Sequence, residues 1–202
     1  RTEKLYFCVG AVSGKGIPAA MVMTVISSMF QTLSDSEDSP LRIMTAINAS
    51  ASARNENLMF VTLFVGSLDL TTGVLQYTNA GHNAPAVITD GKPSFLSVDA
   101  NIPVGIIPDW TYSQQETTLS PGTVLFLYTD GLTEAARSDG ELFQEERVLS
   151  QLASLGENRS AEQLVADMTV EVNRFIGNAE QSDDLTMLVL KWIPTAGSDR
   201  GR

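Results

Sequence analysis

The stretch Leu5-Tyr6-Phe7-Cys8-Val9-Gly10-Ala11-Val12-Ser13-Gly14-Lys15-Gly16-Ile17-Pro18 decides how the chain begins to fold. Its first five residues are apolar and aromatic, which predicts a buried strand. The glycines that follow predict a turn, and Pro18 lies in the first turn of a helix, where its missing N–H costs nothing. Because this strand lies so close to the start, we expect that an N-terminal piece of its domain is missing or lies in another segment.

The rest of the chain predicts an α+β fold. Ser39-Pro40 marks the start of a second helix, and Ser160 with Gln163 forms a capping box for a later one. Hairpins are expected at Thr71-Thr72-Gly73 and at Ser120-Pro121-Gly122. We expect helices over 18–33, 40–54, 144–155 and 160–176, and strands over 5–9, 60–70, 74–78, 86–89, 95–98, 111–119, 123–129 and 185–192. This order of elements is typical of an α+β domain.

The composition excludes several classes of protein. The chain has 202 residues, 43% of them hydrophobic, so one domain with a sizeable core is expected and disorder is excluded. A net charge of −11 argues against nucleic acid and anionic membranes as partners. No apolar run reaches about 18 residues, so no transmembrane helix is expected. Cys8 is the only cysteine, which excludes an internal disulfide and favours a cytoplasmic setting. The alternative is the cytoplasmic domain of a larger protein that is tethered to a membrane outside this segment.

The glycine-rich loop from Gly10 to Gly16 is the first candidate site. A loop of this kind at the start of a helix can bind a phosphate through backbone N–H groups. Its spacing does not match a Walker A loop, and a plain turn remains the alternative. Lys15 either contacts an anionic substrate or is solvated.

Two acidic motifs follow or precede apolar strands. Thr129-Asp130-Gly131 comes at the end of one strand, and Ser182-Asp183-Asp184 comes before the last one. If those strands are neighbours, the carboxylates converge, and oxygen ligands of this kind suit Mg²⁺ or Mn²⁺. The alternatives are a turn-forming Asp-Gly pair and an exposed acidic loop.

The motif Asn79-Ala80-Gly81-His82-Asn83-Ala84-Pro85 contains the only histidine of the chain, so a site with several histidines is excluded. His82 is either a general acid or a structural residue that forms hydrogen bonds in a turn. Cys8 lies in an apolar strand and is expected to be an inert, buried thiol.

Taken together, the motifs at 12–20, 79–85, 128–135 and 182–186 resemble the metal-dependent protein phosphatases of the 2C type, in the bacterial branch of SpoIIE and RsbU. The resemblance implies a β-sandwich of two mainly antiparallel sheets flanked by helices. It implies one phosphatase domain over 1–193, without its first strands, and a flexible tail over 194–202. It also implies hydrolysis of phosphoserine or phosphothreonine by a water that two Mg²⁺ or Mn²⁺ ions activate.

The resemblance assigns roles to individual residues. Asp130 and Asp183 match catalytic metal ligands, with Asp184 beside them, and the backbone carbonyl of Val12 matches a further ligand. The family loop reads Gly-Asp-Val-Ser-Gly-Lys-Gly, and its metal-bridging Asp is Ala11 here. A fourth family Asp, on an upstream strand, has no match. Two hard cations would therefore meet too few oxygens, and we expect impaired metal binding and catalysis.

The resemblance also assigns substrate binding to Lys15 and His82. Ala11 is either an engineered replacement of the bridging Asp or a mark of a natural pseudophosphatase.

Three functions are compared at this stage. The first is a phosphatase acting on a phosphorylated regulatory protein, by family analogy an anti-sigma-factor antagonist with a STAS fold in a partner-switching pathway. The second is a non-catalytic module that binds proteins, and the third is an acidic globular domain with chance motifs. The apolar helix over 18–33 either pairs in a homodimer or is a core helix.

Overall fold

The computed structural model describes residues 3–53, 59–156, 159–179 and 183–194. The elements in chain order are β1 (Lys4–Val12), α1 (Gly16–Ser36), α2 (Pro40–Ala53), β2 (Val61–Asp69), β3 (Val74–Ala80), β4 (Ala86–Thr89), β5 (Lys92–Phe95), β6 (Gln115–Thr118), β7 (Val124–Tyr128), α3 (Asp130–Thr133), α4 (Gln144–Leu155), α5 (Ala161–Ile176) and β8 (Met187–Lys191). Some expectations concern residues outside the described ranges. These are the end of the second helix at Arg54, the start of the second acidic motif at Ser182 and the tail from 195 onward.

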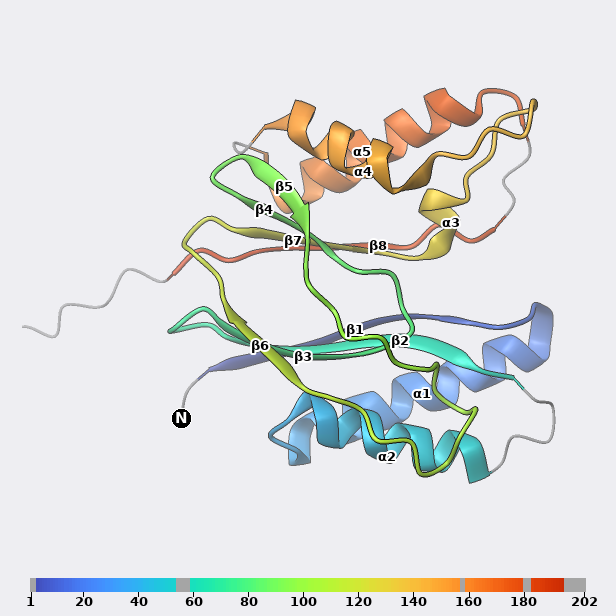
Figure 1. Ribbon diagram of the computed structural model, residues 1–202, viewed down its shortest axis with the longest axis vertical. Helices are drawn as coiled ribbons and strands as arrows, with labels where there is room; N and C mark the ends of the chain where they lie inside the picture. The colour runs from blue at the N-terminus through green and yellow to red at the C-terminus, as the bar shows by residue number, and fades with distance from the viewer. Residues whose placement is uncertain (1–2, 54–58, 157–158, 180–182, 195–202) are drawn as a thin grey trace, which may run out of the picture.

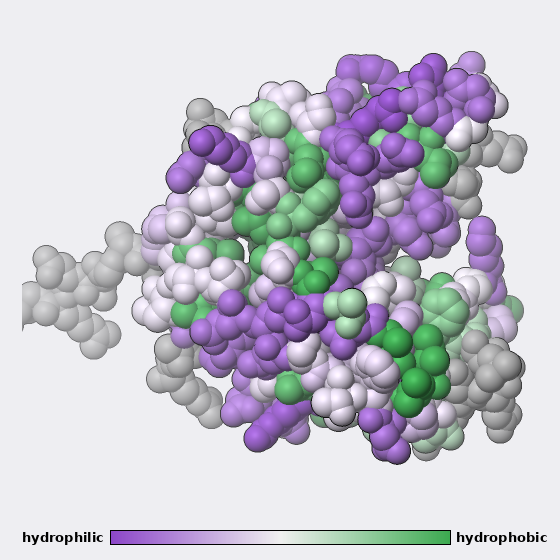
Figure 2. Space-filling view, in the orientation of Figure 1, coloured by the Kyte–Doolittle hydropathy of each residue, from purple (hydrophilic) through white to green (hydrophobic). Residues whose placement is uncertain are grey.

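Two four-stranded sheets lie face to face in the structure. The first has the order β1-β2-β3-β6 and the second the order β5-β4-β7-β8, and every neighbouring pair is antiparallel. Helices α1 and α2 cover the outer face of the first sheet, and α4 and α5 cover the outer face of the second (Figure 1). In the view of Figure 2, hydrophilic residues cover much of the α4 and α5 layer. The predicted α+β sandwich is confirmed.

Three apolar clusters hold these four layers together. The cluster between the sheets contains Phe7, Phe64 and Leu75 of the first sheet and Leu125 of the second. Each outer face packs against its pair of helices in a cluster of its own. Residues in a strand alternate between the two faces of a sheet, and strand β7, which is buried on both faces, therefore reads as a continuous hydrophobic run.

The predicted hairpin around Ser120-Pro121-Gly122 is wrong. Strand β6 pairs with β3 in the first sheet, whereas β7 pairs with β4 and β8 in the second. The turn therefore carries the chain from one sheet to the other, and the N–H of Gly122 donates to the carbonyl of Trp192 (2.9 Å). A turn signal marks the change of direction but not the partner of the next strand. The other predicted hairpin, between β2 and β3, is confirmed.

Helix α1 is longer and more apolar than expected. It spans 21 residues and, by length and composition alone, is able to cross a membrane, although no unbroken apolar run reaches about 18 residues, as the sequence analysis noted. Uncharged Ser, Thr and Gln residues interrupt the apolar positions of this helix. They break the apolar run, but the mean hydropathy of the helix stays high enough for a membrane-spanning segment. In the structure, one side packs on the first sheet through Val22, Ile26 and Met29, and Ile17 and Met21 are exposed.

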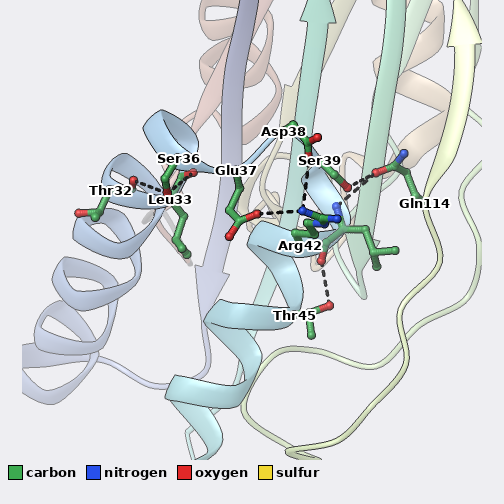
Figure 3. A network of polar contacts seen from close by, with 10 residues as sticks. Thr32, Leu33, Ser36, Glu37, Asp38, Ser39, Arg42, Thr45 and Gln114 are labelled. Carbon is green, nitrogen blue, oxygen red and sulfur yellow. Dashed lines mark hydrogen bonds and ion pairs between the residues drawn. The ribbon is translucent and has the colours of Figure 1, made fainter.

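The connection from α1 to α2 is fixed by polar contacts (Figure 3). Arg42 lies 3.7 Å from carboxylate oxygens of both Glu37 and Asp38. The hydroxyl of Ser39 donates to the side-chain carbonyl of Gln114, 2.6 Å away, in the segment before β6. Because exposed ion pairs contribute little to stability, the ion pairs of Arg42 add little to the stability of this connection.

Candidate active site

Ala11 and Val12, near the end of β1, point in different directions. Phe7 and Val9 belong to the cluster between the sheets, so alternation along the strand turns the side chain of Ala11 toward the second sheet as well. Val12 pairs across the ladder with Val61, which exchanges both of its backbone hydrogen bonds with Val104 (3.0 and 2.8 Å). The backbone N–H and carbonyl of Val61 therefore point away from β1, so Val12 and Val61 form a pair without hydrogen bonds between them. The carbonyl of Val12 consequently points away from β2, to the open edge of the sheet.

The two acidic motifs lie on neighbouring strands, which is the condition under which the sequence predicted that their carboxylates converge. Strand β7 pairs with β8, so Asp130 after β7 and Asp184 before β8 lie at the same end of the second sheet. The hydroxyl of Thr129 donates to the carbonyl of Asp184 (3.2 Å) and accepts from the N–H of Thr186 (3.1 Å). Thr129, to which the sequence analysis gave no role of its own, thereby ties the two acidic segments together.

The chain turns sharply at Asp130 into the short helix α3, which the sequence did not predict. A carboxylate oxygen of Asp130 accepts the N–H of Gly131 (3.0 Å), and one of Asp183 accepts the N–H of Asp184 (2.8 Å). Gly131 packs against the second acidic segment so closely that a Cβ there would lie 2.2 Å from the carbonyl oxygen of Asp184. Glycine at 131 is therefore what allows the two acidic segments to approach.

One cleft of about 940 Å³ joins the ends of the two sheets. In Figure 1, the loop after β1 and α3 lie at the same end of the sandwich. The cleft brings together six of the seven residues singled out from the sequence, which are Ala11, Val12, Lys15, Asp130, Asp183 and Asp184. Lys15 is exposed and directly precedes α1, whose first turn contains no acidic residue. The cleft therefore combines an acidic wall with a cationic helix start.

The carboxylates in this cleft do not fit the two-ion site that the resemblance implies. Across the described ranges, no group of three or more His, Cys, Asp or Glu side chains is placed to hold a metal ion. Asp130 and Asp183 come from the second sheet, and the position that faces them from the first sheet is the methyl group of Ala11. The carboxylate ligands that hard divalent cations prefer are thus supplied from one side only.

His82 lies beneath the cleft instead of on its surface. Its side chain is 6% exposed, and its Nδ1 lies 3.0 Å from the hydroxyl of Thr62. Its backbone N–H donates to Asn79 Oδ1, and its carbonyl accepts from Asn79 Nδ2 (3.1 and 2.9 Å). Burial lowers the pKa of His82 to about 4, while nearby Asp130 acts in the opposite direction. These contacts favour the hydrogen-bonding interpretation over direct substrate binding.

Cys8 agrees with its expected inert character. Its free thiol is half-buried, and burial raises its pKa to about 11, so the nucleophilic thiolate is scarce at neutral pH.

Comparison with known proteins agrees with this architecture. The family profile described as Stage II sporulation protein E (SpoIIE) matches residues 1–193. The chain is 26% identical over 190 residues to the phosphoserine phosphatase RsbU of Bacillus subtilis (strain 168), a match that covers 94% of this chain and 56% of RsbU. The chain thus spans about half the length of that relative.

Two solved structures are similar to this fold. The crystal structure of RsbU and RsbW domains from Mycobacterium tuberculosis has a TM-score of 0.82 at 27% identity, covering 95% of this chain and 53% of that one. The PP2C phosphatase domain of SpoIIE from Bacillus subtilis, with a fragment of its regulatory domain, has a TM-score of 0.79 at 17% identity, covering 96% and 55%. From the match over 193 residues we conclude that the chain belongs to the SpoIIE family of PP2C-type phosphatase domains.

Proposed function

We propose that this domain, over residues 1–193, is a Mg²⁺- or Mn²⁺-dependent protein serine/threonine phosphatase whose activity is impaired by Ala11. The observation that carries the proposal is the cleft in which Ala11 faces Asp130 and Asp183 from the opposite sheet. In PP2C-type phosphatases, two such ions supply the activated water. Asp130 and Asp183 are the proposed ligands from the second sheet, with Asp184 and the Val12 carbonyl beside them.

The proposed substrate is a phosphorylated regulatory protein, namely a STAS-domain anti-sigma-factor antagonist in a bacterial partner-switching pathway. The similarity to RsbU, a phosphoserine phosphatase, supports this substrate class. We assign Lys15 to the phosphoryl group because this exposed cation lines the same cleft as the acidic residues. A cytoplasmic location and pairing of two copies through α1 belong to the same proposal, and the uncharged, partly exposed face of α1 supports the pairing.

A second candidate function is a non-catalytic module that binds a protein partner. The methyl group of Ala11 favours it, because the described part of the cleft offers too few grouped carboxylates for two ions. This function predicts partner binding that is unaffected by EDTA and by the phosphorylation state of the partner. Pull-down of phosphorylated and unphosphorylated partner, with and without EDTA, separates the two candidates.

The test of the proposed catalysis is the substitution Ala11→Asp, made in the longest form of the protein that its gene encodes. We expect Mn²⁺-dependent release of phosphate from a phosphoserine protein to rise more than about 100-fold, since changes to outer-shell groups alone alter metal sites 10- to 100-fold. The double variant A11D/D130N is the control and should stay inactive. Absence of phosphate release by A11D would reject the phosphatase proposal.

A further inference from the structure

Thr62 lies directly across the β1–β2 ladder from Ala11. The two residues are paired in the antiparallel register, so their side chains lie on the same face of the first sheet, the face that borders the cleft. The hydroxyl of Thr62 donates to the backbone carbonyl of Ala11 over 3.3 Å. Directly opposed side chains in such a ladder have Cβ atoms about 5 Å apart, which is close enough to interact.

The same hydroxyl contacts His82. The distance from Thr62 Oγ1 to His82 Nδ1 is 3.0 Å. A threonine hydroxyl can donate one proton and accept from a second group, and which of the two atoms donates between Thr62 and His82 depends on the tautomer of the imidazole. The three residues thus form a chain of hydrogen bonds from His82 through Thr62 to the backbone at position 11.

The far end of this chain is anchored in the fold. His82 is buried, and Asn79 at the end of β3 holds both its N–H and its carbonyl. The ring lies near enough to Asp130 for that carboxylate to influence its protonation. The hydrogen-bonded chain therefore runs beneath the cleft, between the strand that presents position 11 and the strand end that presents Asp130.

We infer that Thr62 and His82 are positioning residues, which fix the backbone of β1 at position 11 so that the side chain there faces Asp130 and Asp183. The inference rests on the proposed function only for its catalytic consequence. The positioning of the β1 backbone by Thr62 and His82 does not depend on the side chain at position 11, so it can be tested in the unmodified chain. Asn79 holds the backbone of His82 and thereby fixes the end of the hydrogen-bonded chain that lies opposite Ala11.

Hydrogen exchange in the unmodified chain tests the structural part. We expect Thr62→Val to speed amide exchange in residues 9–13 by about 5-fold or more, because it removes two hydrogen bonds at a half-buried site. Thr62→Ser should restore the slow exchange. Thr78→Val is the matched control, since the buried hydroxyl of Thr78 has no partner among the described residues. Unchanged exchange in T62V, or an equal increase in T78V, would overturn the inference.

A second pair of variants separates the effect of the His82 imidazole on amide exchange from the effect of the backbone of its loop. In His82→Asn, the side-chain amide lies close to the position of Nδ1 and can either donate to or accept from the Thr62 hydroxyl, whereas His82→Leu offers neither a donor nor an acceptor. Asn79 contacts only the backbone of His82 and is unaffected by either change. Exchange in residues 9–13 should rise in H82L and remain slow in H82N. Equal exchange in both variants would contradict the role of the ring.

The catalytic consequence is measured in the A11D variant by calorimetric titration with Mn²⁺. We expect A11D/T62V to bind Mn²⁺ about 10- to 100-fold more weakly than A11D, as found for groups that orient metal ligands, and A11D/T62S to bind like A11D. Equal affinity of A11D/T62V and A11D would overturn the positioning role. If A11D releases no phosphate, the proposed function fails, and the exchange experiment alone decides whether Thr62 fixes β1.

Discussion

At the scale of single residues, position 11 separates this chain from a complete two-ion site. The Ala11 side chain faces the cleft because alternation along β1 places it on the same side as Phe7 and Val9. A carboxylate at this position would lie opposite Asp130 and Asp183 across the cleft. Within the described cleft, the oxygens missing from the side of the first sheet are thus those of the side chain at position 11.

Gly131 offers a test of how closely the acidic segments pack. Within a helix, replacing glycine with alanine is normally stabilising by about 0.5–1 kcal/mol. Here the added Cβ would lie 2.2 Å from the carbonyl oxygen of Asp184, so Gly131→Ala should instead destabilise the domain by about 1–3 kcal/mol. Thermal unfolding gives the sign of the effect directly. An unchanged or higher Tm would contradict the close approach of α3 and the segment before β8.

The single histidine predicts a specific dependence of stability on pH. Burial lowers the pKa of His82 from 6.5 to about 4 in the folded state, so between these values the unfolded chain binds a proton that the folded chain does not. Stability should therefore fall by up to about 3 kcal/mol as the pH decreases from 6.5 to 4. Urea unfolding across this range measures the loss.

The control for the pH dependence is His82→Asn, which has no group that titrates in this window and should show little slope between pH 6.5 and 5. The lowered pKa values of Asp69, held by backbone N–H groups of Thr72 and Thr71, and of Glu141, held by Arg147, add losses only below their usual values of 3.8 and 4.5. A slope in H82N equal to that of the parent would show that other groups are responsible.

Sequence reasoning located some of these residues and missed others. Asp130 and Asp183 stand beside apolar strands, and this pattern suffices to predict carboxylates at the end of a sheet. Thr62 is one more β-branched residue in a strand run, and nothing in its spacing separates it from Thr78. Its contacts with Ala11 and His82 depend on the register of β1 with β2 and on the end of β3, which are long-range features.

At the scale of elements, local signals predicted helices better than strand partners. Helix α4 has the predicted bounds, and α5 begins with the predicted capping box. Strand β6 covers only residues 115–118 of the nine residues expected, and β5 ends where the predicted strand at 95–98 begins. Helix starts are encoded within a few residues, whereas the length of an edge strand depends on the strand that it pairs with.

The capping box of α5 predicts a measurable contribution to stability. Ser160 Oγ accepts the N–H of Gln163 (3.2 Å), and Gln163 Oε1 accepts the N–H of Ser160 (2.9 Å). Ser160→Ala should destabilise the domain by about 1 kcal/mol and lower its Tm by about 2–4 °C. The matched control is Ser154→Ala within α4, where alanine favours the helix and no loss is expected. Equal Tm changes in both variants would contradict the capping role.

At the scale of the whole molecule, the cleft exists because two sheets end together. The first sheet contributes the end of β1 and the start of α1, and the second contributes the ends of β7 and β8. The predicted sandwich followed from the resemblance to the family, and the order of elements alone predicted only an α+β domain. The wrong hairpin at Ser120-Pro121-Gly122 shows why, since the assignment of strands to sheets is decided by packing between distant segments.

The central claim is that one methyl group prevents this cleft from holding two divalent cations. The most direct measurement is a calorimetric titration of the unmodified chain and of A11D with Mn²⁺, side by side, with A11D/D130N as the control. We predict two bound ions per chain in A11D, and at most one weakly bound ion in the unmodified chain and in the control. Two tightly bound ions in the unmodified chain, or no gain in A11D, would contradict the account.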